Sequence, residues 1–380
     1  MTISKVLLPA TVLLLCGCAT AAGPELPGSS EAPATFAVDL RDVPRLEAIM
    51  PQLTDNRVVF VGESHDRYSH HLNQLAIIRG MHERHPDLVI GLEFFQQPFQ
   101  PYLDDYVAGK ISEKEMLRGT EYYSRWKFDY RLYRPILNYA REQGLKLLAL
   151  NVPEELTRKV ARQGFDGLEP AEQAQLPEIG EAGEPYRQRL QAIYNTHPHE
   201  GDNEKSFEHF MQAQLLWDEG MAERAADFLR EHPERAMVLL AGSGHLAYGI
   251  GIPSRLERRV AVTSALVLND PQEELTPDIA DFVLMAESTP LPSKGRLGIF
   301  MGDSEDGVLV RDFTEESAAQ SAGLQREDRI VRIDGQPIDN TADVQLALLD
   351  GRAGDTVTLM VERDQWLAGS EQVEYSVTLR

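Results

Sequence analysis

Short apolar runs alternate with longer amphipathic segments over about the first 270 residues, and this alternation predicts an α/β fold. The runs that we interpret as strands lie at 58–61, 88–92, 146–150, 236–241 and 260–268, with a weaker sixth at 282–286. The segments that we interpret as helices lie at about 69–84, 98–117, 122–143, from 153 onward, and 205–231. Since strands that alternate with helices pair side by side in parallel, we expect a mostly parallel sheet with helices on both faces.

A polar, proline-rich stretch separates this pattern from a different one. Residues 271–293 have the composition of a linker, so we place the first domain at 36–270. From 294 to 380 the chain shows short strands, glycine turns and one or two helices. This second pattern predicts a small C-terminal β-barrel domain.

The N-terminus has the pattern of a secretion signal. Lys5 precedes a short apolar run, 6–15, which is shorter than the roughly 20 residues that a membrane-spanning helix needs. The run ends in Leu15-Cys16-Gly17-Cys18, which resembles a bacterial lipobox. We therefore predict a signal segment over 1–18 and lipidation of Cys18, with ordinary cleavage near Ala21 as the alternative.

The residues after Cys18 indicate where in the cell the protein is expected. Residues 19–35 are rich in Ala, Gly, Pro and Ser and indicate a flexible tether. The lipobox resemblance implies a protein held on a membrane by lipid alone. The residue after the cysteine is Ala19 and not Asp. By the same resemblance, this implies that the protein is anchored in the outer membrane and faces the periplasm or the cell surface.

Charge and cysteine content exclude several classes of function. The net charge of -23 argues against nucleic acid as a partner, because phosphate binding needs a basic surface. The only two cysteines, Cys16 and Cys18, are both in the signal region. The mature protein is thus expected to lack disulfides, cysteine zinc sites and covalently attached haem, so any metal must bind oxygen and nitrogen ligands.

Polar residues follow the predicted strands where each strand ends. These residues are Glu63, His65, Glu93, Asn151 and His245. In open parallel sheets ligands bind beyond the carboxyl ends of the strands, so we expect these side chains to converge. Glu and His are the residue types of a metal site or an acid/base pair. Each also has a structural interpretation: a cap on helix N–H groups, a hydrogen bond to a carbonyl, or an ion pair.

Two of the predicted helices carry further candidates. In the helix over 205–231, Gln214 and Asp218 lie one turn apart and could face the same cleft. The helix over 122–143 is rich in aromatic residues, which core packing alone would explain. The other interpretation is a wall for a planar ligand, with a tyrosinate as iron ligand and nearby arginines paired to carboxylates.

The order of these blocks resembles a known family. Val59 to His65, Gly91 to Glu93, Leu150 to Pro153, Gln214 to Met221 and Ala241 to His245 stand in the order seen in ChaN-like lipoproteins of the Tiki/TraB-like superfamily. The resemblance covers about 37–268. It implies haem binding in iron acquisition, with the iron held by a single tyrosine and two haems stacked face to face in a homodimer.

The resemblance also assigns residues to the haem site. For the iron ligand our first choice is Tyr133, followed by Tyr130 and then Tyr68. The remaining contacts to haem would come from the strand ends and one arginine: Glu63, His65, Glu93, His245 and Arg134.

The same superfamily implies a rival function. It contains metal-dependent peptidases that use the Glu/His turn after the first strand. In this chain Glu63, His65, Glu93 and His245 would then hold a divalent metal ion and activate water. We favour a haem-binding protein that is not an enzyme and keep the hydrolase as the alternative.

The C-terminal pattern resembles a PDZ domain. Gly295 to Phe300 matches the carboxylate-binding loop, and blocks at 307–310, 317–324, 328–335 and 343–349 follow in PDZ order. The resemblance implies that a peptide C-terminus docks as an added strand. Its contacts would be Arg296, Leu297, Gly298, Ile299 and Phe300. An intramolecular packing role is the alternative.

Overall fold

The computed structural model describes residues 37–196, 204–272, 274–365 and 369–380. The chain divides into two compact units, Met1–Pro44 and Arg45–Arg380. The described part of the first unit is exposed, and Arg41 there pairs with Asp39. The predicted signal, the tether and Cys18 lie outside the described residues. Within the described ranges, no helix combines the length and the apolar character needed to cross a membrane.

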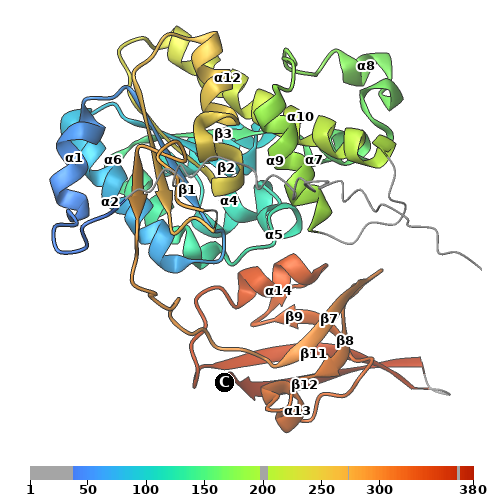
Figure 1. The fold of residues 1–380 in the computed structure, drawn as a ribbon. Coiled ribbons are helices and arrows are strands. Elements are labelled where there is room, and N and C mark those ends of the chain that lie inside the picture. Colours follow the sequence, from blue (N-terminus) through green and yellow to red (C-terminus); the bar gives the residue numbers. More distant parts are fainter. Residues whose placement is uncertain (1–36, 197–203, 273, 366–368) are drawn as a thin grey trace, which may run out of the picture. The chain divides into compact units, whose positions relative to one another are not determined.

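The first domain is built on a six-stranded parallel sheet, which confirms the α/β prediction (Figure 1). Its strand order is β3-β2-β4-β1-β5-β6. The strands are β1 (Val58–Glu63), β2 (Val89–Gln96), β3 (Lys146–Asn151), β4 (Met237–Gly242), β5 (Ser264–Asn269) and β6 (Phe282–Leu284). Because β6 pairs with β5, the sheet extends beyond residue 270 into the stretch that we predicted as a linker.

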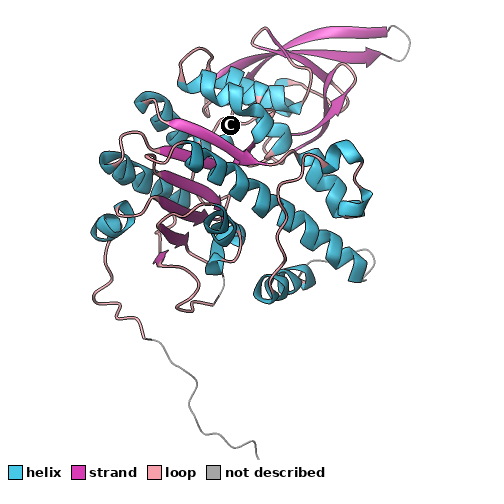
Figure 2. Cartoon of the chain, turned by 90° about the horizontal axis from the view of Figure 1, so that it is seen from above, coloured by secondary structure: helices cyan, strands magenta, loops and turns pink. Residues whose placement is uncertain are grey.

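Helices cover both faces of this sheet (Figure 2). One core contains Val59 and Val61 of β1, and the other contains Val58 and Phe60, since successive side chains of a strand point to opposite faces. The first core is covered by α1 (Leu46–Thr54), α2 (Tyr68–Arg84), α3 (Gln100–Val107), α4 (Glu113–Gly119) and α6 (Arg134–Gln143). The second is covered by α10 (Glu204–Glu231), α11 (Ser243–Leu246) and α12 (Ile252–Arg259).

The remaining elements of this domain are short or lie against α10. They are α5 (Tyr122–Arg125), α7 (Glu154–Gln163), α8 (Pro170–Gln173), α9 (Glu184–Asn195) and the 3-10 turns η1 (Gln97–Phe99), η2 (Tyr130–Leu132), η3 (Phe165–Gly167) and η4 (Ala247–Gly249). The helix predicted over 98–117 is therefore two helices, α3 and α4. A capping box at Ser112 starts α4.

The single helix that we predicted over 122–143 was wrong. It is divided into α5, η2 and α6, with Lys127 in a left-handed conformation at φ 68°. Such a residue cannot continue a right-handed helix. The last part restarts at Arg134 with Pro135 in its first turn, where the missing N–H of proline costs no hydrogen bond. The helical spacing that we used to align the aromatic residues therefore does not apply.

The C-terminal domain is an antiparallel sheet with two short helices, as expected for a PDZ-like module. Its main strand order is β12-β11-β9-β8-β7, and β10 pairs with β9. The elements are β7 (Ile299–Ser304), β8 (Gly307–Phe313), α13 (Ala318–Ala322), β9 (Arg329–Ile333), β10 (Gln336–Pro337), α14 (Thr341–Ala347), β11 (Thr356–Gln365) and β12 (Gly369–Thr378). β7 ends the path, so one of its edges has no strand beside it among the described residues.

Candidate functional site

The structure brings together residues that lie at or just after the carboxyl ends of β1, β2 and β4. Glu63 is the last residue of β1, and it is in register with Gly242 at the end of β4. Glu93 lies in β2, on the other side of β4. His65 follows β1, and His245 lies in α11 directly after β4. Adjacent parallel strands that end at one edge thus deliver all four side chains to one place.

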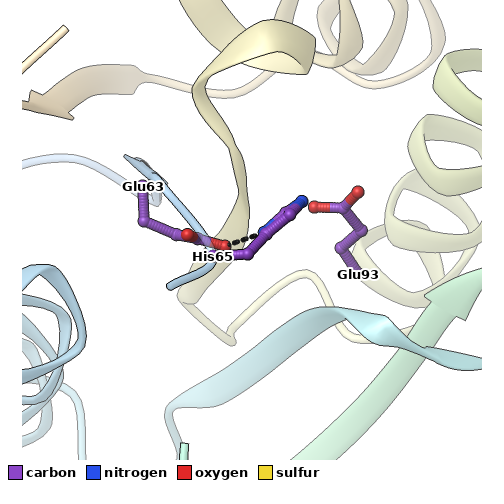
Figure 3. A group of neighbouring side chains, drawn as sticks. All are labelled: Glu63, His65 and Glu93. Atoms are coloured by element: carbon purple, nitrogen blue, oxygen red, sulfur yellow. Dashed lines mark hydrogen bonds and ion pairs between the residues drawn. The ribbon is translucent and has the colours of Figure 1, made fainter. Parts of the chain in front are cut away.

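Glu63, His65 and Glu93, which we call the Glu/His cluster, form its centre (Figure 3). Glu63 Oε1 lies 2.5 Å from His65 Nδ1. Each residue offers one ligand atom, and these three atoms all lie within 4.8 Å of one another. The second oxygen of Glu63, Oε2, is buried and has no hydrogen-bond partner in the described part of the chain. A buried carboxylate oxygen without a partner is costly, so the cluster fits a cation.

A second histidine–carboxylate pair adjoins the cluster. His245 Nδ1 lies 2.6 Å from Asp218 Oδ1, and its Nε2 lies 3.4 Å from Glu93 Oε1. The hydroxyl of Tyr186 donates to the other oxygen of Asp218 at 2.7 Å. The sequence placed Asp218 on a helix face that could meet the cleft. It contained no signal for Tyr186, which lies on α9.

Both histidines of the site favour the protonated form. For His65, burial lowers the pKa, but the hydrogen bond that its ring donates to Glu63 and the charge of Glu93 outweigh burial and raise the pKa to about 9. For His245, burial again lowers the pKa, and the charges of Asp218 and Glu93 raise it to about 9. The carboxylates therefore hold positive charge at this edge of the sheet, whether it comes from protons or from a metal ion.

Gly242 lies close to the side chain of His65. A Cβ at this position would lie 3.0 Å from Cε1 of His65 and 3.7 Å from Oε2 of Glu93. The backbone N–H of Gly242 donates to that same oxygen at 2.6 Å. A side chain here would crowd the ring of His65, whereas its contact with Glu93 would be an ordinary van der Waals contact. By contrast, a Cβ on Gly244 would meet nothing within 4 Å.

Two buried histidines on α2 hold the turn that carries His65. His70 Nδ1 accepts a hydrogen bond from the backbone N–H of Ser64 at 3.0 Å, so its Nε2 carries the proton toward Asp270. Burial lowers the pKa of His70, which favours this neutral form. His71 Nε2 lies 3.1 Å from the carbonyl oxygen of His65. The sequence showed only that these neighbours point in different directions.

The tyrosines that we favoured as iron ligands lie in the core. Tyr130 and Tyr133 are 0% and 1% exposed. The hydroxyl of Tyr130 donates to Glu113 at 2.9 Å, and the hydroxyl of Tyr133 accepts from Trp126 at 3.1 Å. Burial raises the pKa of both phenols well above 10, which disfavours a phenolate. Neither oxygen is presented to a ligand in this conformation.

Tyr68, our third choice, is partly exposed where α2 begins. Beside the same turn, Trp126 and Phe128 are also partly exposed, and we call these two the aromatic rim. Their rings lie 4.8 Å and 4.9 Å from the ring of His65. Arg134, proposed to meet a carboxylate of the ligand, already pairs with Glu113 at 2.6 Å. The aromatic rim is therefore the partly exposed surface in contact with His65, and Tyr68 lies three residues further along the chain.

The C-terminal domain has a groove of about 270 Å³ between β7 and α14. Of the predicted peptide contacts, four line it: Arg296, Leu297, Gly298 and Ile299. The fifth, Phe300, does not; it is 58% exposed on the opposite side of β7, because side chains alternate along a strand. Val344 and Leu348, from the 343–349 block that the PDZ resemblance makes the groove helix, complete the apolar lining with Met301, which the sequence analysis did not name.

Comparisons with known proteins match both domains. Residues 49–256, more than half of the chain, match the family model described as "Haem-binding uptake, Tiki superfamily, ChaN". Residues 295–378 match the PDZ domain model. A solved structure of ChaN of Campylobacter jejuni with cofacial haem is 20% identical, with a TM-score of 0.52, over 64% of this chain and 92% of that one. At this identity the likeness shows the fold alone.

Two curated relatives are longer than this chain. The Reticulata-related 5 protein of Arabidopsis thaliana is 26% identical over 265 residues, which is 64% of this chain and 36% of that protein. The serine protease Do-like HtrA of Bacillus subtilis is 32% identical over 118 residues, 30% of this chain and 25% of that protein. The chain thus spans about a third of the first relative's length and a quarter of the second's.

Proposed function

Because the chain belongs to the ChaN family of the Tiki superfamily, whose description is haem-binding uptake, we propose that it binds haem in iron acquisition. The family match over 49–256 is the observation that carries this proposal. The aromatic rim beside His65 supports it, because partly exposed rings offer a flat surface to a porphyrin.

We assign the iron ligand to Tyr68. It is the one of our three candidate tyrosines whose side chain is partly exposed, and it lies three residues after His65 in the same turn. Tyrosinate is an established axial ligand of haem iron. Arg67, the exposed residue before Tyr68, would supply a guanidinium for a propionate.

Haemin titration of the chain from Gly23 to Arg380 tests this assignment. We expect a saturable Soret band that Tyr68→Phe abolishes. The controls are Tyr133→Phe, in the core, and Tyr102→Phe, which is 42% exposed on α3. Both should bind like the wild type. An unchanged Soret band in Tyr68→Phe would reject the ligand, and the absence of any band would reject haem binding.

We further propose that the haem complex is a homodimer with two haems face to face. The cofacial haem binding of ChaN of C. jejuni supports this arrangement. Sedimentation with and without haemin tests it: the mass should double as one haem binds per chain. A monomer that binds haem fully would contradict it.

The C-terminal domain is proposed to dock the C-terminus of a partner protein. Its groove is apolar at Leu297, Ile299, Met301 and Leu348 and lies along the edge of β7 that no strand of the described part of the chain pairs with. An added strand would use the backbone of β7, and the backbone N–H groups around Gly298 would meet the carboxylate. A labelled peptide ending in free valine should bind, whereas the same peptide with an amidated end should bind at least tenfold more weakly.

The location at the outer membrane is also a proposal, supported by the lipobox pattern at 15–18. In cells, Cys18→Ala should move the protein from the membrane fraction to the soluble fraction. Cys16→Ala removes the neighbouring cysteine and should leave the protein in the membrane fraction. Identical behaviour of the two variants would contradict lipidation at Cys18.

A second function, metal-dependent hydrolysis, is favoured by one specific observation, the partnerless Oε2 of Glu63 in a cluster with ligand spacing. Glu63, His65 and Glu93 would hold a divalent ion, with His245 beside it. Such an ion polarises a bound water and supplies the nucleophile. Metal-free protein should bind Zn²⁺ or Mn²⁺ in equilibrium dialysis, and His65→Ala should not. Peptide turnover that chelation stops would then establish hydrolysis, whereas metal binding without turnover would leave a structural ion.

A further inference from the structure

A cavity of about 140 Å³ lies beyond the carboxyl ends of β2 and β3, and its lining includes Trp126 of the aromatic rim but none of the three residues of the Glu/His cluster. Aromatic side chains form much of its wall, among them Phe95 of β2, Trp126 and Trp217. An apolar cavity of about 150 Å³ holds a molecule the size of benzene. The cavity therefore has room for a single six-membered ring.

Two polar atoms of this lining are buried and lack a hydrogen-bond partner among the described residues. They are the hydroxyl of Tyr122 and Oδ1 of Asn151. Tyr122 is 1% exposed, and burial raises its pKa well above 10, so its phenol keeps the proton. The hydroxyl can thus donate, and the amide oxygen can only accept. Native proteins rarely leave such buried groups unpaired, because each costs stability.

Arg125, a basic residue of the cavity lining, is already paired with two carboxylates. The guanidinium of Arg125 is 2.8 Å from Glu121 and 2.9 Å from Glu155. It also donates to Oε1 of Gln96 at 3.0 Å. No net positive charge is left here to attract an anion, so the lining favours a neutral ligand.

We propose that this cavity is a binding site for a small, neutral, planar ring whose substituent both donates and accepts a hydrogen bond, such as a carboxamide or a phenolic hydroxyl. The ring would pack between aromatic walls, and the substituent would pair with the Tyr122 hydroxyl and the Asn151 oxygen. The same two tryptophans connect this site to the histidines: Trp126 lies 4.8 Å from His65, and Trp217 lies 6.2 Å from His245. The site requires neither haem nor metal.

Benzamide tests the proposal, with the chain from Gly23 to Arg380 titrated by calorimetry without haem and in the presence of a chelator. Benzamide should bind, and toluene, which lacks the polar group, and benzoate, which is charged, should each bind at least tenfold more weakly. Tyr122→Phe should weaken benzamide at least fivefold. The matched control is Tyr123→Phe, whose ring lies 5.3 Å from that of Tyr122 but does not line the cavity. It should bind benzamide like the wild type.

Thermal unfolding of the ligand-free variants supplies a second measurement. Because Tyr122→Phe deletes an unpaired buried hydroxyl, it should raise the melting temperature while it lowers benzamide affinity. Asn151→Leu should show the same pair of effects. The proposal is overturned if benzamide binds no better than toluene, or if both variants lower the melting temperature and leave benzamide binding unchanged. That second result would mean that ordered water satisfies the two groups.

Discussion

In the parallel-sheet domain the candidate site consists of ionisable side chains that are buried and paired, whereas the groove of the C-terminal domain consists of apolar side chains and an open strand edge. Glu63 and Glu93 are 4% and 5% exposed, and each meets a histidine. The groove instead offers Ile299, Met301 and the backbone of β7. The first site depends on the identity of each side chain, and the second depends mainly on backbone geometry. Substitutions should therefore reduce stability at the first site and ligand affinity at the second.

The largest effect should come from Asp218→Ala. It leaves His245 and the hydroxyl of Tyr186 buried without their partner, and breaking a buried charged pair costs about 3–5 kcal/mol. Urea unfolding should show this loss. Asp227→Ala is the control on the same helix, because its side chain is 48% exposed, and it should change stability by about 0.5 kcal/mol or less. If both substitutions lowered the free energy of unfolding equally, the pairing of Asp218 with His245 would not stabilise the fold more than an exposed ion pair does.

A pH effect of similar origin should follow from His65 and His245. Their folded-state pKa of about 9 lies above the ordinary histidine pKa of 6.5, so their contribution to stability is full below pH 6.5 and is lost as the pH rises through 9. Each histidine contributes roughly 3 kcal/mol at most to the free energy of unfolding. In the presence of a chelator, the free energy of unfolding should fall between pH 6.5 and 9.5, and less so in His245→Gln. A flat profile across this range would contradict the raised pKa values.

Gly242→Ala should separate the two sites without a change of charge. Its methyl group would crowd the ring of His65, and we expect at least a tenfold loss of Zn²⁺ affinity, which corresponds to about 1.4 kcal/mol. Peptide binding by the C-terminal domain should not change. Gly244→Ala, two residues away in open space, should bind Zn²⁺ normally. If both variants lost Zn²⁺ affinity, the cause would be a general distortion of the segment that contains Gly242 and Gly244, and not the contact with His65.

Gly298→Ala should have the smallest effect on stability and a clear effect on peptide affinity. Gly298 has φ +72°, and a Cβ there would lie 2.7 Å from the Cα of Ser317. The strain should cost about 1–2 kcal/mol and weaken peptide binding at least tenfold. Gly335→Ala has similar strain at φ +76° but open space and lies outside the groove. It should leave peptide affinity intact, which fluorescence anisotropy would show.

The sequence predicted the features that depend on local pattern. Apolar runs located the strands of the first sheet, and the rule that ligands bind beyond strand ends anticipated that Glu63, Glu93 and His245 would lie together. The C-terminal fold followed from the glycine-containing loop at 295–300 and the order of blocks after it. These features are encoded within a few residues of chain.

Features that depend on tertiary contact could not be predicted in the same way. The split of the 122–143 segment requires Lys127 at positive φ, although Pro135 was an available signal for a new helix start. Burial of Tyr133 depends on how that segment packs over β2, where its ring lies 4.1 Å from that of Phe94. The contact from Tyr186 to Asp218 joins α9 to α10 and has no local signature.

The central claim, that haem binds beside the Glu/His cluster through Tyr68, is tested most directly by resonance Raman spectroscopy of the ferric haem complex. Iron–tyrosinate vibrations should be present in the wild type, present in Tyr133→Phe and absent in Tyr68→Phe. If these vibrations persist in Tyr68→Phe and disappear in Tyr133→Phe, the buried tyrosine is the ligand, and the claim that this exposed turn binds iron is wrong.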